Sequence, residues 1–232
     1  MSEYPRVPRT TPARNPQRVS YDRAAVHAVL DEAVVCHVGF VVDGRPVVLP
    51  QLHARVGDAL YLHGSTGARA LRAAQDGGLA VCVTVTLVDG LVLARSGFNS
   101  SINYRSVVAH GLATVVDDRA EKEAVLDALV DAVVPGRAAA VRRPTRRELA
   151  ATTVLRLPLE EVSLKVRSGP PLDEPEDLGL PVWAGVLPLT TGAGEPVPDP
   201  ALPTGTPVPE HVRSWARPAP RPGELRPGEL RP

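Results

Sequence analysis

The feature that most constrains this fold is a series of β-like runs joined by turns of only two residues. Val34–Val42 and Arg45–Val56 are rich in β-branched residues and are separated by Asp43-Gly44, the strongest short hairpin signal. A second such turn, Gly57-Asp58, precedes another run over Ala59–Gly64. Parallel strands need a connection of about a dozen residues or more. The short turns therefore indicate antiparallel pairing.

The β pattern continues through most of the central region. We expect a hairpin turn at Asp89-Gly90 and a bulge or sharp bend at Gly111, because glycine inside a strand often marks one. The expected strands cover Leu79–Val88, Leu91–Ser96, Asn103–Val116 and Thr152–Arg167.

Helices are expected in the connections between these strands. Apolar side chains recur at helical spacing from residue 22 to 33 and again after Asp117-Asp118, from Ala124 to Val133. Shorter helices are expected over 65–77 and 145–151. Successive hairpins with inserted helices favour a closed or nearly closed barrel, since closure removes exposed strand edges. The predicted fold is therefore mainly β with helices (α+β), an antiparallel barrel.

Proline sets the expected boundaries of the folded domain. Residues 1–18 carry four prolines among Arg and Thr, and residues 195–232 carry eleven. Such segments bury too little apolar surface to offset the entropy of ordering them. We expect a flexible N-terminal arm over 1–18, one domain over 19–190 and a disordered proline-rich tail over 191–232.

Composition excludes several classes of function. Basic and acidic residues balance at 26 each and the chain has only eight aromatic residues, which argues against a nucleic-acid groove. Two cysteines inside apolar runs do not make a disulfide framework. No apolar stretch approaches the roughly 18 residues of a membrane span. We expect a cytoplasmic protein that binds neither nucleic acid nor a membrane.

One candidate anion site lies between residues 61 and 69. A strand ends at Gly64, Ser65 and Thr66 follow, and the expected helix has Arg69 in its first turn. Free N–H groups and the helix dipole at such a position suit a phosphate. An ordinary Ser/Thr helix cap with a solvated arginine fits the same pattern slightly better from the residues alone.

Other polar residues give weaker signals. His63 stands beside this turn, where it would contact a bound ring or simply bond to backbone. The segment 99–106, with Arg105 and Ser106, suits either a polar ring edge or a hydrated loop. The spacing of Cys36, His37 and His53 lacks a dense ligand pair, so no metal site is predicted.

The order of these motifs resembles the pyridoxamine 5′-phosphate oxidase-like family over about residues 18–190, and more narrowly its nitroimidazole-resistance branch. The resemblance rests on several short segments: Val-Gly-Phe at 38–40, Pro46–Pro50, Tyr-Leu-His-Gly-Ser at 61–65, residues 85–96, Asn-Tyr-Arg-Ser-Val at 103–107, residues 165–171 and Trp-Ala-Gly at 183–185.

That resemblance implies a split β-barrel of Greek-key type, a homodimer that binds flavin mononucleotide (FMN) at the subunit interface. By analogy, the backbone of Val48, Leu49 and Pro50 would line the isoalloxazine ring, and His63, Gly64 and Ser65 would border the ring and the ribityl chain. Arg69 would hold the phosphate. Arg105 and Ser106 would lie at the polar side of the flavin, and Trp183 would cover it from the partner subunit.

Two departures from the oxidases themselves narrow the expected activity. Ala70 stands where they carry a lysine after the phosphate-binding arginine, and Val186-Leu187-Pro188 replaces their Arg-x-His pair. Oxidation of pyridoxamine phosphate is therefore not expected. The resemblance implies an FMN-dependent oxidoreductase acting on a small molecule, with no catalytic residue assigned. The alternative is a flavin, deazaflavin or haem carrier without turnover.

Overall fold

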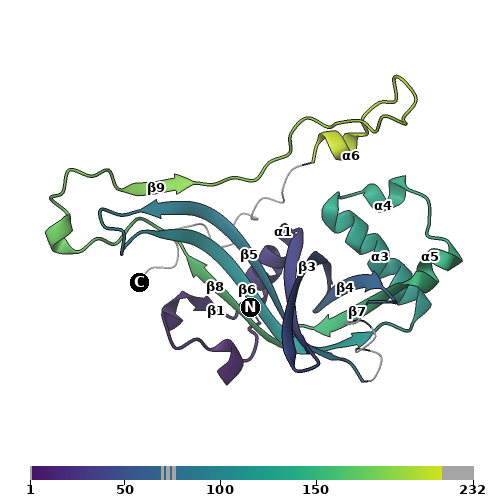
Figure 1. The fold of residues 1–232 in the computed structure, drawn as a ribbon, viewed down its shortest axis with the longest axis horizontal. Helices are drawn as coiled ribbons and strands as arrows, with labels where there is room; N and C mark the ends of the chain where they lie inside the picture. The colour runs from purple at the N-terminus through teal and green to yellow at the C-terminus, as the bar shows by residue number, and fades with distance from the viewer. Residues whose placement is uncertain (1, 69–70, 72–73, 75–76, 216–232) are drawn as a thin grey trace.

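The protein is described by a computed structural model that covers residues 2–68, 71, 74 and 77–215 (Figure 1). The chain forms one long antiparallel sheet with helices at its margins, which confirms the predicted α+β class. No helix in these ranges is long and apolar enough to cross a membrane.

Six strands close into a barrel because β5 pairs with β2 on one side and with β6 on the other. In order around the barrel they are β2 (Val35–Val42), β3 (Arg45–Val56), β4 (Ala59–Ser65), β7 (Thr152–Pro158), β6 (Ser101–Val115) and β5 (Leu79–Leu93). Three strands lie outside this ring: β8 (Glu161–Arg167) pairs with β6, β1 (Val19–Ser20) with β8, and β9 (Gly185–Pro188) with the far end of β5.

The longer helices begin at residues that satisfy their free N–H groups. The Asp22 carboxylate accepts a hydrogen bond from the Ala25 N–H at 2.8 Å, and Asp118 does the same for Glu121 at 2.7 Å. The helices are α1 (Arg23–Glu32), α3 (Arg119–Val133), α4 (Arg137–Ala140), α5 (Arg146–Ala151) and α6 (Glu210–Arg213), with 3₁₀ turns η1 (Pro8–Thr10), η2 (Pro16–Arg18) and η3 (Pro175–Asp177).

The main hydrophobic core lies between the inward faces of the barrel strands and helix α1. Val26, Val29 and Leu30 of α1 are buried against strand residues such as Val83 and Leu164. A smaller cluster joins α3 to β4 and β7. Helix α3 is therefore attached to the outside of the barrel, as Figure 1 also shows.

The first two hairpins agree with the sequence, and the third does not. Asp43 and Gly44 have φ of 50° and 72°, as a two-residue hairpin turn requires. By contrast, the hairpin predicted at Asp89-Gly90 is wrong, because β5 runs through both residues with only a register shift between Val88 and Gly90. β6 and β9 pair with Gly90 from its two sides, which keeps the strand extended.

Two further strand predictions are corrected. Residues 152–167 form two strands rather than one, and the break lies at Leu159, whose N–H donates to the carbonyl oxygen of Asp58 at 2.9 Å. β7 pairs with β4 and β8 with β6, so the break lets the chain change partners. Of the bulge or sharp bend expected at Gly111, the bulge is wrong, because Gly111 is in regular register with Val81.

The two terminal segments contact the domain at specific points. Within residues 2–18, predicted as a flexible arm, the Tyr4 side chain is only 2% exposed and belongs to the main core. Within the predicted tail, α6 is followed by Trp215, whose indole N–H donates to the Val133 carbonyl oxygen at 2.8 Å. Residues 69–70, 72–73 and 75–76 of the helix expected over 65–77, and the tail after 215, lie outside the described residues.

Candidate functional site

A cavity of about 730 Å³ opens where strands β3 and β4 separate. The two strands pair only from His53 to Val56 and from Ala59 to Leu62. The next residues along them, Leu52 and His63, both line the cavity. The site therefore results from the split in the barrel.

Helix α3 supplies the apolar wall of this cavity. Val125 and Leu129 of the helix are buried in the cluster that attaches it to the barrel. Leu129 also lines the cavity, together with Val130, Val133 and Leu126, which packs against the edge of the same cluster. A mostly apolar cavity of this size has the properties of a binding site for a small molecule or cofactor.

His63 is the residue with metal-binding capacity in the cavity wall. Its Nδ1 atom is buried and has no hydrogen-bond partner in the described part of the chain. Burial lowers the pKa of His63, which favours the neutral imidazole at pH 7. A neutral ring nitrogen with a free lone pair is the form that ligates a metal.

Arginine side chains line the mouth of the cavity. Arg142 bonds to Glu148 through two nitrogen atoms, at 2.9 and 2.6 Å, and Arg143 pairs with Asp127. Arg137 also lines the cavity, and within the described ranges its guanidinium forms no ion pair. One cation at the mouth is thus available to an anionic ligand.

The predicted anion-binding turn follows directly from His63. Gly64 and Ser65 end strand β4, and the Ser65 hydroxyl accepts a hydrogen bond from the Gly67 N–H at 3.3 Å. A Cβ atom at Gly64 would lie 2.8 Å from Cδ1 of Leu71, so this position is tightly packed. Arg69, the predicted phosphate ligand, lies outside the described residues.

The predicted flavin-lining residues of β3 lie on an exposed part of the sheet. Val48, Leu49 and Pro50 pair with Gly39, Val38 and His37 of β2. The side chains of Val48 and Leu49 are 62% and 48% exposed, which is unusual for apolar residues in a strand. They lie beyond the point where β3 leaves β4, near the same split.

Arg105 is engaged in a part-buried ion cluster. Its guanidinium donates hydrogen bonds to Asp89, at 3.0 and 2.8 Å, and to both carboxylate oxygens of Glu32. Burial lowers the pKa of Arg105, but the two carboxylates outweigh this effect and raise it above the usual value. Ser106, beside it on β6, donates to the Val85 carbonyl oxygen at 3.1 Å.

Trp183 is placed apart from the other predicted site residues. Its side chain is 68% exposed, and a Cβ atom added at Gly185 would lie 2.9 Å from the indole ring. The ring thus rests on the backbone at the start of β9. His63, Gly64 and Ser65 follow one another along β4. Among the described residues of one chain, none of these three residues forms a hydrogen bond or ring contact with Trp183.

Sequence reasoning missed the cavity-lining flank of α3. Its apolar stripe was recognised, but the same spacing is expected whether the stripe packs on a sheet or lines an open cavity. Arg137 was likewise not singled out. The local sequence does not show whether an apolar flank of the helix packs on the sheet or lines a cavity, because this depends on where strands β3 and β4 separate.

Comparisons with known proteins agree with this architecture. A family model described as pyridoxamine 5′-phosphate oxidase matches residues 22–166. The flavocytochrome Anf3 from Azotobacter vinelandii is 39% identical, with a TM-score of 0.84 over 90% of this chain and 97% of that one. The FAD and heme binding protein from Mycobacterium smegmatis is 44% identical, with a TM-score of 0.80 over 84% of this chain and 96% of that one.

A more distant structure shares the fold alone. A proposed 5-nitroimidazole antibiotic resistance protein from Bacteroides thetaiotaomicron is 23% identical, with a TM-score of 0.54 over 64% of this chain and 86% of that one. No curated protein matches the chain. The family model covers more than half of the sequence, and two solved structures of high identity cover most of it. The chain therefore belongs to the pyridoxamine 5′-phosphate oxidase family.

Proposed function

We propose that this chain is a redox protein that binds a flavin and a haem, with the haem in the cavity beside α3. The observation that carries the proposal is His63, whose pKa burial lowers, in the wall of a mostly apolar cavity of about 730 Å³. Two similar proteins support it, since one is a flavocytochrome and the other an FAD and heme binding protein.

The residues of the cavity fit the chemistry of a haem. A haem is a flat apolar ring with a central iron and two carboxylate groups, and when bound it supplies one-electron chemistry. His63 would hold the iron through a neutral imidazole nitrogen. Leu126, Val130 and Val133 offer an apolar surface, and Arg137 offers a cation to a carboxylate group.

We propose that the flavin binds near the end of β4, with FAD in place of the FMN expected from the sequence. Val48–Pro50 and His63–Ser65 lie on either side of the split between β3 and β4 and remain the proposed contacts to the ring and its chain. FAD is favoured over FMN because the FAD and heme binding protein is 44% identical to this chain. With these cofactors, we propose an oxidoreductase that acts on a small molecule.

We also propose that the protein is a homodimer. Strands β2 and β3 carry Val35, Val41, Val48 and Leu49 with large exposed apolar side chains, which a second copy would cover. A molar mass from light scattering tests this. A mass twice that of the chain is expected, and Val48→Glu combined with Leu49→Glu should reduce it to that of one chain.

The cofactors are tested first by the absorption spectrum of the purified full-length protein. A flavin band near 450 nm and a Soret band are expected, and the released flavin should comigrate with FAD. His63→Gly should lose most of the haem, and added imidazole should restore it, because free imidazole replaces the missing ligand. Leu52→Ala is the control, since Leu52 lines the cavity without a ligand atom. A colourless protein that binds neither cofactor would contradict the proposal.

A further inference from the structure

The last part of the described chain contacts the outside of the helix that walls the cavity. Residues 189–207 are exposed throughout and form neither helix nor strand. After them, helix α6 and Trp215 lie against the corner between helices α3 and α4, as Figure 1 also shows. Holding both ends of such a segment costs conformational entropy, which the contact at its end has to offset.

Two contacts attach this segment to the corner. The indole N–H of Trp215 donates a hydrogen bond of 2.8 Å to the carbonyl oxygen of Val133, the last residue of α3. Carbonyl groups in the last turn of a helix have no partner within the helix, so Trp215 satisfies one of them. At Gly136, where the chain turns into α4, an added Cβ atom would lie 3.8 Å from Cβ of His211. The corner and α6 are therefore in van der Waals contact.

The corner forms part of the wall of the His63 cavity. Val133, Val134 and Arg137 all line that cavity. The Asp131 carboxylate accepts a hydrogen bond of 2.7 Å from the Ala138 N–H, which joins the last turn of α3 to α4. The position of this joined unit relative to strands β3 and β4 therefore determines the shape of the cavity.

The corner has less support from the core than the rest of α3. The apolar cluster that attaches α3 to the barrel includes Val125 and Leu129, but none of the residues from Val130 to Val134. Segments with few buried apolar contacts open at a lower free energy than the core. The corner and α6 can therefore separate while the barrel stays folded.

We propose that residues 210–215 are a detachable clamp on the α3–α4 corner, and that release of this clamp opens the cavity for entry and exit of its ligand. Trp215 is the positioning residue of the clamp. It does not line the cavity, so it acts through the wall that it holds. The clamp follows from the contacts of Trp215 and His211, whereas haem as the ligand rests on the proposed function.

Hydrogen exchange of the full-length protein as purified, measured by mass spectrometry, tests the clamp itself. In Trp215→Ala, the amides of residues 130–140 should exchange at least about fivefold faster, while those of β4 and β7 keep their rates. Trp215→Phe should act in the same direction, because it removes the N–H and keeps an aromatic ring. Val197→Ala is the matched control, since Val197 is 91% exposed in the preceding segment. Unchanged exchange in Trp215→Ala, or faster exchange throughout the barrel, would overturn the inference.

The effect on the ligand is measured as the rate of haem transfer to excess apomyoglobin. Trp215→Ala should accelerate this transfer at least about fivefold relative to Val197→Ala. Faster exchange at the corner without faster haem transfer would show that the clamp does not control the cavity.

A reversible lock on the clamp should have the opposite effect. The 3.8 Å between the two Cβ positions suits a disulfide, so Gly136→Cys combined with His211→Cys should slow haem transfer when oxidised and lose this effect when reduced. Gly136→Cys alone is the control, because it has the same backbone strain. Equal rates in the oxidised and reduced forms would overturn the inference. A protein that binds no haem would instead refute the proposed function, and the exchange rates would then decide on the clamp.

Discussion

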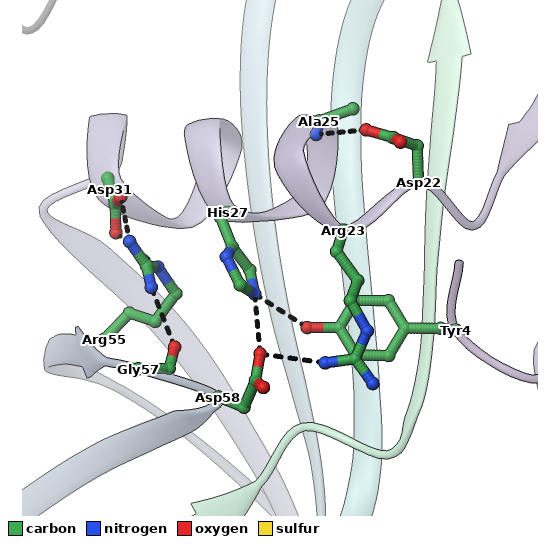
Figure 2. Close-up of polar contacts among 9 residues, drawn as sticks. All are labelled: Tyr4, Asp22, Arg23, Ala25, His27, Asp31, Arg55, Gly57 and Asp58. Atoms are coloured by element: carbon green, nitrogen blue, oxygen red, sulfur yellow. Dashed lines mark hydrogen bonds and ion pairs between the residues drawn. The ribbon is translucent and has the colours of Figure 1, made fainter. Parts of the chain in front are cut away.

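The phenol oxygen of Tyr4 lies 2.8 Å from Nε2 of His27, a contact that joins the N-terminal segment to helix α1 (Figure 2). Around this pair, Asp58 lies 3.5 Å from the same imidazole nitrogen and 2.8 Å from the Arg23 guanidinium. The Arg23 guanidinium also stacks 4.3 Å from the centre of the Tyr4 ring. Burial raises the pKa of Tyr4 to about 12, so the phenol stays protonated and able to donate.

Replacing Tyr4 with Phe should lower the free energy of unfolding by about 1 kcal/mol, because a part-buried hydrogen bond is lost while the ring stays packed. Chemical denaturation monitored by circular dichroism measures this. Tyr104→Phe is the control, since the Tyr104 hydroxyl has no hydrogen-bond partner among the described residues. Equal effects of the two substitutions would show that the contact to His27 does not stabilise the fold.

Stability should fall as the pH is lowered below about 6.5, the usual pKa of histidine. His53 is buried and its Nε2 atom lies 2.9 Å from the Leu30 carbonyl oxygen. Burial lowers the pKa of His53 in the folded state, so the unfolded chain takes up a proton first. The stabilisation that comes from the neutral His53 is fully present above pH 6.5. As the pH falls below this value, the free energy of unfolding decreases by up to about 1.4 kcal/mol per pH unit.

His53→Gln should make this dependence on pH less steep between pH 7 and 5, as measured by the free energy of unfolding at each pH. The same substitution at the exposed His37 is the control. An unchanged slope in His53→Gln would show that another group causes the acid sensitivity.

Arg105→Met should destabilise the fold by about 3 kcal/mol. The substitution leaves the carboxylates of Glu32 and Asp89 without the guanidinium that neutralises them. Urea denaturation gives the loss directly. Arg119→Met removes an exposed pair with Glu123 and should cost far less, because solvent screens that pair. If both substitutions cost the same, the Arg105 cluster is not a major source of stability.

Gly111→Ala should cost about 1 to 3 kcal/mol through overpacking. A Cβ atom at this position would lie 2.8 Å from Cδ1 of Leu157, so this fully buried leucine would have to shift. Gly97→Ala is the matched control, because a Cβ there would meet nothing within 4 Å. A shift of the midpoint of thermal unfolding in the first variant alone is the expected result.

Val130→Phe should reduce the haem content of the purified protein, since the larger side chain extends into the cavity where we place the haem. The free energy of unfolding of the haem-free protein should change little, because the added ring fills space that is already open. The haem content is measured from the pyridine haemochrome spectrum. Ala124→Phe, on an exposed position of α3 outside the cavity lining, should keep its haem.

The first three barrel strands and their antiparallel sense could be predicted because their signals are local. Asp43 and Gly44 tolerate the positive φ that the hairpin turn requires. The strand predicted over Arg45–Val56 is observed with the same first and last residues. Helix α5 likewise follows from Thr145 and Glu148, which cap each other's backbone N–H groups. In each case the residues that specify the element lie within it or next to it.

The pairing of elements and the environment of each side chain were decided only by the tertiary structure. The Asp89-Gly90 signal is as strong as that at Asp43-Gly44, yet two strands distant in the chain hold it extended. Arg105 was expected at a ligand, but Glu32 and Asp89, which are 73 and 16 residues away, bind its guanidinium. The cavity of His63 exists because β3 and β4 separate beyond Leu62. Backbone preferences are properties of single residues, whereas burial and charge neutralisation depend on partners that only folding brings near.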